Sequence, residues 1–469
     1  MKSKIFVVLI LVILSACSSQ PSVNNDVPTP TAQQITLNVG LYPYVPRPEQ
    51  FKKVLIEEWN AMQTGITLNV ITDDKLWDGG YRTSPENLDV FVFDALFLNK
   101  YRNQDLLEPF LTQEINPAGL DDFLPYAING VKNSDNQTYA GIPLLGCTNI
   151  LFYKKNLNIT PSSTLAEVKK AVKTCRYTGT VPGAGDKNGM MLDISGSTTN
   201  GTFYVATQYA IHGKYPFPTP SSIDEKVTQR LTELMEMSSY LNSTNGDLQP
   251  YQRGIWFGEG HGNSFVGFTE DMWGISQGNG KKLPDDFSFM PLPLWNPGET
   301  SKPLFFADVI GVNAKSKNLT HAKKLAALLG SKKVVVKSST GATQDGVPQY
   351  LLLTLKSAFD ELAVSYPIYK DMKHVASNPD INMFTLSNDL YTWFDSNKSA
   401  IRTDIREDFS CGCDKTTDVF LIAANAAQEC NKACGKLGWS EQWTSERPFV
   451  PESAKGVCGC NACDIPSSP

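Results

Sequence analysis

Basic residues, histidines and long hydrophobic runs are scarce in this sequence of 469 residues. It carries 42 Lys and Arg against 48 Asp and Glu, a formal net charge of -6 at pH 7, so we expect no nucleic-acid-binding surface. After Leu14, no segment is long and apolar enough to cross a bilayer. The four histidines are His212, His261, His321 and His374. The best placed is His261, but its glycine-flanked stretch is better explained as a solvated turn, and we predict neither a metal nor a cofactor.

The first residues contain two lysines, an unbroken apolar run from Ile5 to Leu14, and small residues before Cys17. This order is typical of an export signal, and the residues from Leu14 to Cys17 resemble a bacterial lipobox. The resemblance implies a signal peptide at 1–16, lipidation of Cys17, a tether at 17–34, and anchoring of the mature chain to a membrane of the cell envelope. A plain secretory signal with a chance cysteine is the alternative.

Cysteines are rare in the long middle of the chain and dense at its end. Between Ser18 and Ser410 there are Cys147 and Cys175, whereas the tail carries Cys411, Cys413, Cys430, Cys434, Cys458, Cys460 and Cys463. Export places cysteines in an oxidising compartment, so we predict a small disulfide-rich module at 405–469, with zinc ligation as the alternative. Seven is an odd number, so one tail cysteine pairs with Cys175 or stays free.

The part before this tail, residues 35–404, alternates between strand and helix patterns, which predicts an α/β fold. Predicted strands cover 35–41, 66–71, 88–93, 265–268 and 304–312, and predicted helices cover 48–62, 322–329 and 360–364. In such folds ligands gather beyond the carboxyl ends of strands. Tyr42, Tyr44 and Asp94 follow such ends.

Cys147 lies within an apolar run, between Gly146 and the polar pair Thr148-Asn149. A buried cysteine is commonly a small hydrophobic residue. The glycine, which lets a backbone approach a ligand, and the polar pair add support for a nucleophile, with a core cysteine as the alternative. A thiol becomes nucleophilic only when a base takes its proton.

Glu270 is the leading candidate for that base. It follows the predicted strand at 265–268 and is bracketed by Phe268, Met272 and Trp273. Apolar walls raise the pKa of a carboxyl group toward neutrality, where it can accept and return a proton. The alternative is a surface acid at a strand end.

Aromatic and acidic residues also gather near predicted strand ends and loops, where they suit a flat or cationic ligand. Plain core packing is the alternative for each aromatic residue. The candidates are Tyr42, Tyr44, Trp77, Tyr81, Tyr251, Trp256, Phe268, Trp273 and Phe306, with the acids Asp94 and Asp308.

Five stretches together resemble the bacterial thiaminase I family in order and spacing, over about residues 35 to 400. They are Thr36–Pro46 with YPYVP, Leu88–Asp94, Gly146–Lys154 with CTN, Val266–Met272 with TED, and Leu304–Asp308. The resemblance implies a two-lobed fold like that of periplasmic solute-binding proteins (type 2), with thiamine bound between the lobes.

The resemblance also implies roles. Cys147 would attack the thiamine pyrimidine and expel the thiazole, and Glu270 would deprotonate first the thiol and then the incoming amine or thiol. The implied substrate-binding residues are Tyr42, Tyr44, Tyr81, Asp94, Tyr251, Phe268, Phe306 and Asp308. Phe268 and Phe306 stand where the family is expected to have tyrosine, so substrate orientation or nucleophile choice is expected to differ.

The stretch from Ala423 to Cys460 is similar to repeats of MVL-type mannan-binding lectins, which implies a possible glycan partner for the tail. Trp439 and Trp443 would stack on sugar rings or fill a small core. A non-catalytic, lipid-anchored solute-binding protein for thiamine or a related pyrimidine is the main alternative for the whole chain. A carbohydrate-binding protein led by its tail is the second alternative.

Overall fold

The computed structural model describes residues 35–41, 45–72, 85, 87–115, 119–172, 184–185, 190–193, 197–242, 251–340 and 346–407. Several predicted features lie outside these residues: the signal and tether, Cys17, Tyr42, Tyr44, Trp77, Tyr81, Cys175 and the cysteine-rich tail. Within the described part, no helix is both long enough and apolar enough to cross a membrane.

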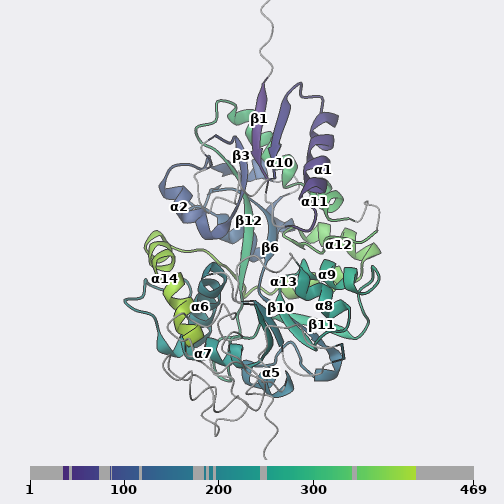
Figure 1. Ribbon diagram of the computed structural model, residues 1–469. Coiled ribbons are helices and arrows are strands. Elements are labelled where there is room, and N and C mark those ends of the chain that lie inside the picture. The colour runs from purple at the N-terminus through teal and green to yellow at the C-terminus, as the bar shows by residue number, and fades with distance from the viewer. Residues whose placement is uncertain are drawn as a thin grey trace, which may run out of the picture.

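The described chain forms two lobes, each built on its own sheet, one above the other in Figure 1. The sheet of the first lobe has the strand order β13-β6-β12-β3-β1-β2, and β14 pairs with one end of β12. β1 runs parallel to β2 and β3, whereas β12 is antiparallel to β3 and β6. The strands are β1 (Thr36–Gly40), β2 (Thr67–Ile71), β3 (Val90–Asp94), β6 (Ile142–Cys147), β12 (Leu304–Val312), β13 (Leu352–Leu353) and β14 (Asn382–Met383).

Apolar side chains on both faces explain why this sheet is buried. The four residues of β3 that precede Asp94 are fully buried, as expected for a strand covered on both faces. The helix α1 begins at Pro48, where the missing N–H costs no hydrogen bond. The helices of this lobe are α1 (Pro48–Ala61), α2 (Leu98–Asn103), α3 (Thr112–Ile115), α4 (Pro125–Val131), α10 (Leu319–Leu329), α11 (Lys332–Ser339), α12 (Lys356–Ser365) and α13 (Ile368–Ala376), and a short ribbon joins β4 (Phe110–Leu111) to β5 (Thr138–Tyr139).

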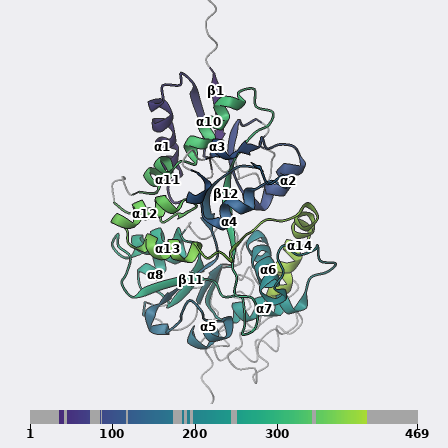
Figure 2. The same ribbon diagram turned by 180° about the vertical axis from the view of Figure 1, so that it is seen from behind.

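The second lobe has a sheet of order β11-β7-β10-β8-β9, seen below the first in Figures 1 and 2. Its strands are β7 (Ile150–Lys154), β8 (Met190–Asp193), β9 (Ser238–Asn242), β10 (Ser264–Gly267) and β11 (Phe287–Pro291). Its helices are α5 (Leu165–Val172), α6 (Ser197–His212), α7 (Glu225–Glu236), α8 (Gln252–Gly258), α9 (Asp271–Gly278) and α14 (Asn388–Glu407). The helix α14 packs on α6 and α7 and continues past residue 404, where we placed the domain boundary.

The described chain crosses between the lobes three times: at Thr148-Asn149, at 292–303, and at 384–387. The first crossing is tied to the second and to the strand that follows it: the Thr148 hydroxyl donates to the carbonyl of Leu304, the first residue of β12, at 2.9 Å. The Leu292 N–H donates to the Asn149 carbonyl at 2.8 Å. Thr148 and Asn149 are therefore buried polar residues of the hinge. From the sequence we interpreted this polar pair as support for a nucleophilic Cys147. In the structure the two residues instead make hydrogen bonds between the segments that join the lobes.

Candidate active site

Cys147 is the last residue of β6, directly before the chain leaves the first lobe. It is a free cysteine, the only one among the residues that the structure describes, and it is partly exposed. It pairs in the sheet with Phe306 of β12. The thiol thus lies where the two lobes meet.

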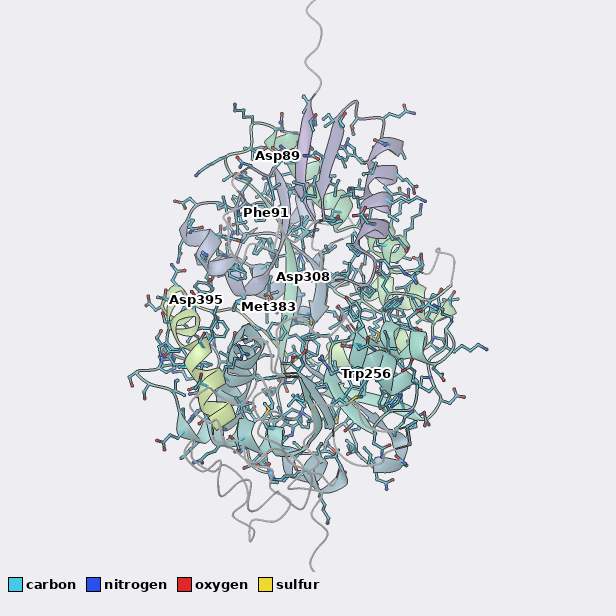
Figure 3. All side chains as sticks on the ribbon, in the orientation of Figure 1. Asp89, Phe91, Trp256, Asp308, Met383 and Asp395 are labelled. Atoms are coloured by element: carbon cyan, nitrogen blue, oxygen red, sulfur yellow. The ribbon has the colours of Figure 1, made fainter. Side chains whose placement is uncertain are left out.

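Two carboxylates lie side by side on β12, which pairs with the strand of Cys147, and on β3, which pairs with the other side of β12. Asp94 and Asp308 face each other directly across the antiparallel β3–β12 pair. Asp308 is 8% exposed, and Figure 3 shows it in the central part of the molecule. The pairing of β12 with β6 shifts register between Asp308 and Val309, an irregularity of the kind that redirects side chains near sites. Burial, and then the charge of Asp94, raise the pKa of Asp308 well above its ordinary value.

The second lobe presents Glu270 and Tyr251 from the starts of two adjacent helices. Glu270 is the residue before α9, and Tyr251 is the residue before α8. The two helices pack closely near their starts, where a Cβ at Gly254 would lie 2.5 Å from the Asp271 carbonyl oxygen and one at Gly274 would lie 2.6 Å from that of Tyr251. This close packing brings both helix starts to one place. Tyr251 adopts φ 62°, an uncommon value for a bulky residue, and its ring contacts Trp273 edge-on.

Electrostatic coupling shows that these groups from both lobes share one environment. Burial raises the pKa of the Cys147 thiol well above its ordinary value, and the charges of Glu270, Asp308, Asp94 and Asp271 raise it further. Burial also raises the pKa of Tyr251, followed by the charge of Glu270. Within the described residues, the charged groups that raise the pKa of Cys147 are carboxylates, which suits a cationic ligand.

Glu270 itself is 8% exposed, which excludes the alternative of a surface acid. Burial raises its pKa to about 7, although a hydrogen bond from the Thr269 hydroxyl, at 3.1 Å, works in the opposite direction. A carboxyl group with this pKa can accept and return protons near neutral pH.

Gly146 has a different role from the one we inferred from the sequence. A Cβ at this position would lie 2.0 Å from the Tyr126 hydroxyl, so glycine makes room for a tyrosine of α4 rather than for a ligand. The Tyr126 hydroxyl is buried without a hydrogen-bond partner, and burial raises its pKa, followed by the charges of Cys147 and Asp308. The sequence carries no signal that identifies Tyr126 as a neighbour of the site.

The two phenylalanines differ in setting. Phe306 is half-buried and packs against Phe384, with ring centroids 4.7 Å apart. Phe268 is 36% exposed and precedes Thr269 at the end of the second-lobe strand β10. Both therefore lie within a few residues of the site groups.

His261 lies on the second lobe after α8, where the Glu259 carboxylate is 3.9 Å from its ring. It is not among the groups that shift the pKa of Cys147 or the pKa of Glu270.

The protein has two lobes, three segments that cross between them and a polar site at their junction. This arrangement is that of the solute-binding-protein-like fold. The maltotriose-binding protein of Thermus thermophilus shares this fold, with a TM-score of 0.55 and 17% identity over 79% of this chain and 94% of that chain.

More specific similarities identify the family. The family profile described as the Thiaminase-1 domain matches residues 148–294, which include Glu270 and begin directly after Cys147. Thiaminase-1 of Paenibacillus thiaminolyticus is 30% identical over 377 residues, covering 79% of this chain and 88% of that protein. The structure of Clostridium botulinum thiaminase I in complex with thiamin matches with a TM-score of 0.71 and 26% identity, over 79% of this chain and all of that one (100%). The chain belongs to the thiaminase I family.

Proposed function

We propose that this chain is a thiamine-degrading enzyme of the thiamine pyridinylase type, which replaces the thiazole of thiamine with an amine or thiol. The observation that carries the proposal is the joint environment of Cys147 and Glu270, contributed by different lobes of a thiaminase I fold. A protein that only binds a solute needs neither a thiol nor a carboxyl group with a pKa of about 7.

In the proposed reaction, Glu270 takes the proton of the Cys147 thiol, and the thiolate adds to an electron-poor carbon of the pyrimidine. The bond between the methylene bridge and the thiazolium nitrogen then breaks, and its electron pair leaves with the neutral thiazole. The incoming nucleophile forms its bond to the methylene carbon and the Cys147 sulfur is released. With its pKa of about 7, Glu270 can lose a proton to water between these steps and accept one from the nucleophile.

The positive charge of the substrate would explain how a buried thiol surrounded by acids can ionise. In the ligand-free site the surrounding carboxylates oppose a thiolate. The positive thiazolium of thiamine, placed beside Asp94 and Asp308, would offset their charge and lower the cost of forming the thiolate. The substrate's own charge would thus activate the nucleophile that attacks it. Tyr251, Phe268 and Phe306 are proposed to contact the substrate, together with Tyr42, Tyr44 and Tyr81.

The direct test is to follow thiamine loss by purified protein, from which residues 1–16 have been removed, with and without pyridine or aniline. We expect consumption only when the amine is present, with formation of the pyrimidinylmethyl-amine product. Tight thiamine binding without consumption in either condition would favour the second candidate, a binding protein for thiamine or a related pyrimidine. The solute-binding-protein-like fold is the observation that favours that candidate.

We also propose that the protein is exported and anchored at Cys17 in the cell envelope, and that residues 405–469 form a disulfide-stapled module that binds glycan. Radiolabelled palmitate should label the wild-type chain but not Cys17→Ser. Deletion of residues 408–469, which spares α14, should abolish retention on mannan and leave thiamine consumption unchanged, whereas a loss of consumption would place the tail in the enzyme.

A further inference from the structure

The short turn that carries Glu270 is held by a buried acid, Asp271, which the proposed reaction does not use. Asp271 is 3% exposed at the start of α9. One of its carboxylate oxygens accepts a hydrogen bond from the Phe268 N–H at 2.9 Å, which closes the turn around Thr269 and Glu270. A Cβ at Gly267 would lie 2.3 Å from the same oxygen, so the strand end has no room for a side chain where this carboxylate sits.

Arg253 of α8 secures the other side of this turn. Its Nε donates to the Val266 carbonyl at 3.1 Å, and its Nη1 donates to the Asp193 carboxylate at 2.8 Å. Its charge also lowers the pKa of Asp271, against the larger opposing effect of burial. A cation therefore lies near Asp271 and favours its ionised form.

We propose that Asp271 is a positioning residue for Glu270: its carboxylate, supported by Arg253, fixes the turn from Gly267 to Asp271 and thereby the direction in which Glu270 enters the site. This inference rests on the proposed function only for the role of Glu270 as a base. The hydrogen bonds and burial that carry it are independent of any substrate.

The charge of Asp271 has a second consequence, because it raises the pKa of Glu270 and that of Cys147. Other groups act on the same pair, and a pH measurement must be interpreted with them in view. The titratable and polar groups that interact with Glu270 are Thr269 of its own turn, Cys147 of β6, Tyr251 before α8, Asp308 of β12 and Tyr369 of α13. Those that interact with Asp271 are Arg253 of α8 and Asp193 of β8. Arg402 of α14 interacts in turn with Asp193. Asp271→Asn, which keeps the acceptor for the Phe268 N–H, is expected to leave all of these groups in place.

Two substitutions separate the geometric role of Asp271 from its charge. Asp271→Asn keeps an oxygen that can accept from the Phe268 N–H but removes the charge. Asp271→Ala removes both. Glu259→Gln serves as the control, because Glu259 is an exposed acid of the same lobe that follows α8.

The first readout is the pH dependence of Cys147 alkylation by iodoacetamide, followed by mass spectrometry of the peptide that contains Cys147. For Asp271→Asn we expect the midpoint to move to lower pH by roughly half a unit to one unit. Glu259→Gln should match the wild type. This readout needs no thiamine turnover, so it tests Asp271 even if the proposed reaction fails.

The second readout is kinetic. A displaced base lowers the rate of the chemical step, so kcat of Asp271→Ala should fall by about 10- to 100-fold with KM for thiamine within about threefold. Asp271→Asn should keep kcat within about tenfold, because the turn stays closed. Wild-type kcat in Asp271→Ala, or an unchanged alkylation midpoint in Asp271→Asn, would overturn the proposal. If Asp271→Ala does not fold, Asp271→Leu, which fills a similar volume but cannot accept from the Phe268 N–H, takes its place in the kinetic test.

Discussion

The two lobes contribute acids to the site in different ways. The first lobe holds Asp94 and Asp308 on regular strands, directly opposite each other in the sheet. The second lobe holds Glu270 in a turn before a helix, buried and flanked by Asp271. Burial raises the pKa of both Asp308 and Glu270, but the charge of a facing acid is the next cause only for Asp308.

This difference indicates a division of labour. Paired acids on a rigid sheet, whose mutual repulsion a cation would relieve, suit the binding of a cation, whereas a single acid with a pKa of about 7 suits proton transfer. Substitutions in the first lobe should therefore affect substrate binding, and substitutions in the second lobe should affect turnover.

The largest effect is expected for Glu270→Gln. Glutamine keeps the shape of the side chain but cannot take a proton, so kcat should fall by about 100- to 10,000-fold. KM for thiamine should change little. Steady-state kinetics beside Glu259→Gln would show this, and a variant with more than a tenth of wild-type kcat would remove Glu270 from the role of base.

A smaller effect of a different kind is expected for Asp308→Asn. Loss of a buried charge beside the thiazolium should raise KM for thiamine by about tenfold, because charge pairs are strong where water is excluded. Asp94→Asn, at a half-buried position, should raise KM by less. If both substitutions lowered kcat and left KM unchanged, the proposed division between the lobes would be wrong.

The smallest effect is a pH-dependent change in folding stability for Glu270→Gln. Because the folded protein raises the pKa of Glu270 from 4.5 to about 7, the folded state binds this proton more tightly than the unfolded state. The stability that Glu270 contributes is thus fully present below pH 4.5 and is lost as pH rises through about 7. At pH 8 Glu270→Gln should be more stable than the wild type, by on the order of 1 to 3 kcal/mol.

Urea unfolding of both proteins at pH 4 and pH 8 measures this difference. The two unfolding curves should nearly coincide at pH 4. If the variant were less stable than the wild type at pH 8, the folded protein would stabilise the ionised form of Glu270, contrary to the effect expected from its burial.

Much of the fold could be predicted from the sequence, because local patterns specify it. The alternating and continuous apolar runs predicted β1, β2, β3, β10 and β12 to within two residues at each end, and the proline before an amphipathic stretch predicted the start of α1. The two-lobed architecture was predicted only through the resemblance to a family, and the structure confirms it. Nothing in the local pattern specifies two lobes.

Site residues could be predicted where their neighbours in the sequence indicate their role. They could not be predicted where the role depends on a contact with a distant part of the chain. Glu270 stood out by its aromatic flanks, and its burial is confirmed. Gly146 was misinterpreted because its neighbour, Tyr126, comes from a helix with no distinguishing pattern. Asp271 was overlooked because an acid at the start of a helix usually faces solvent, and only the fold shows Arg253 beside it.

The central claim is that the Cys147 sulfur attacks thiamine, and the most direct measurement is thiamine loss by Cys147→Ser beside the wild type, with aniline present at neutral pH. A serine hydroxyl is far less acidic than a thiol, so Glu270 should be unable to activate it. The account predicts consumption by the wild type and none by the variant, with both proteins folded and both binding thiamine. A serine variant that consumes thiamine at the wild-type rate would contradict it.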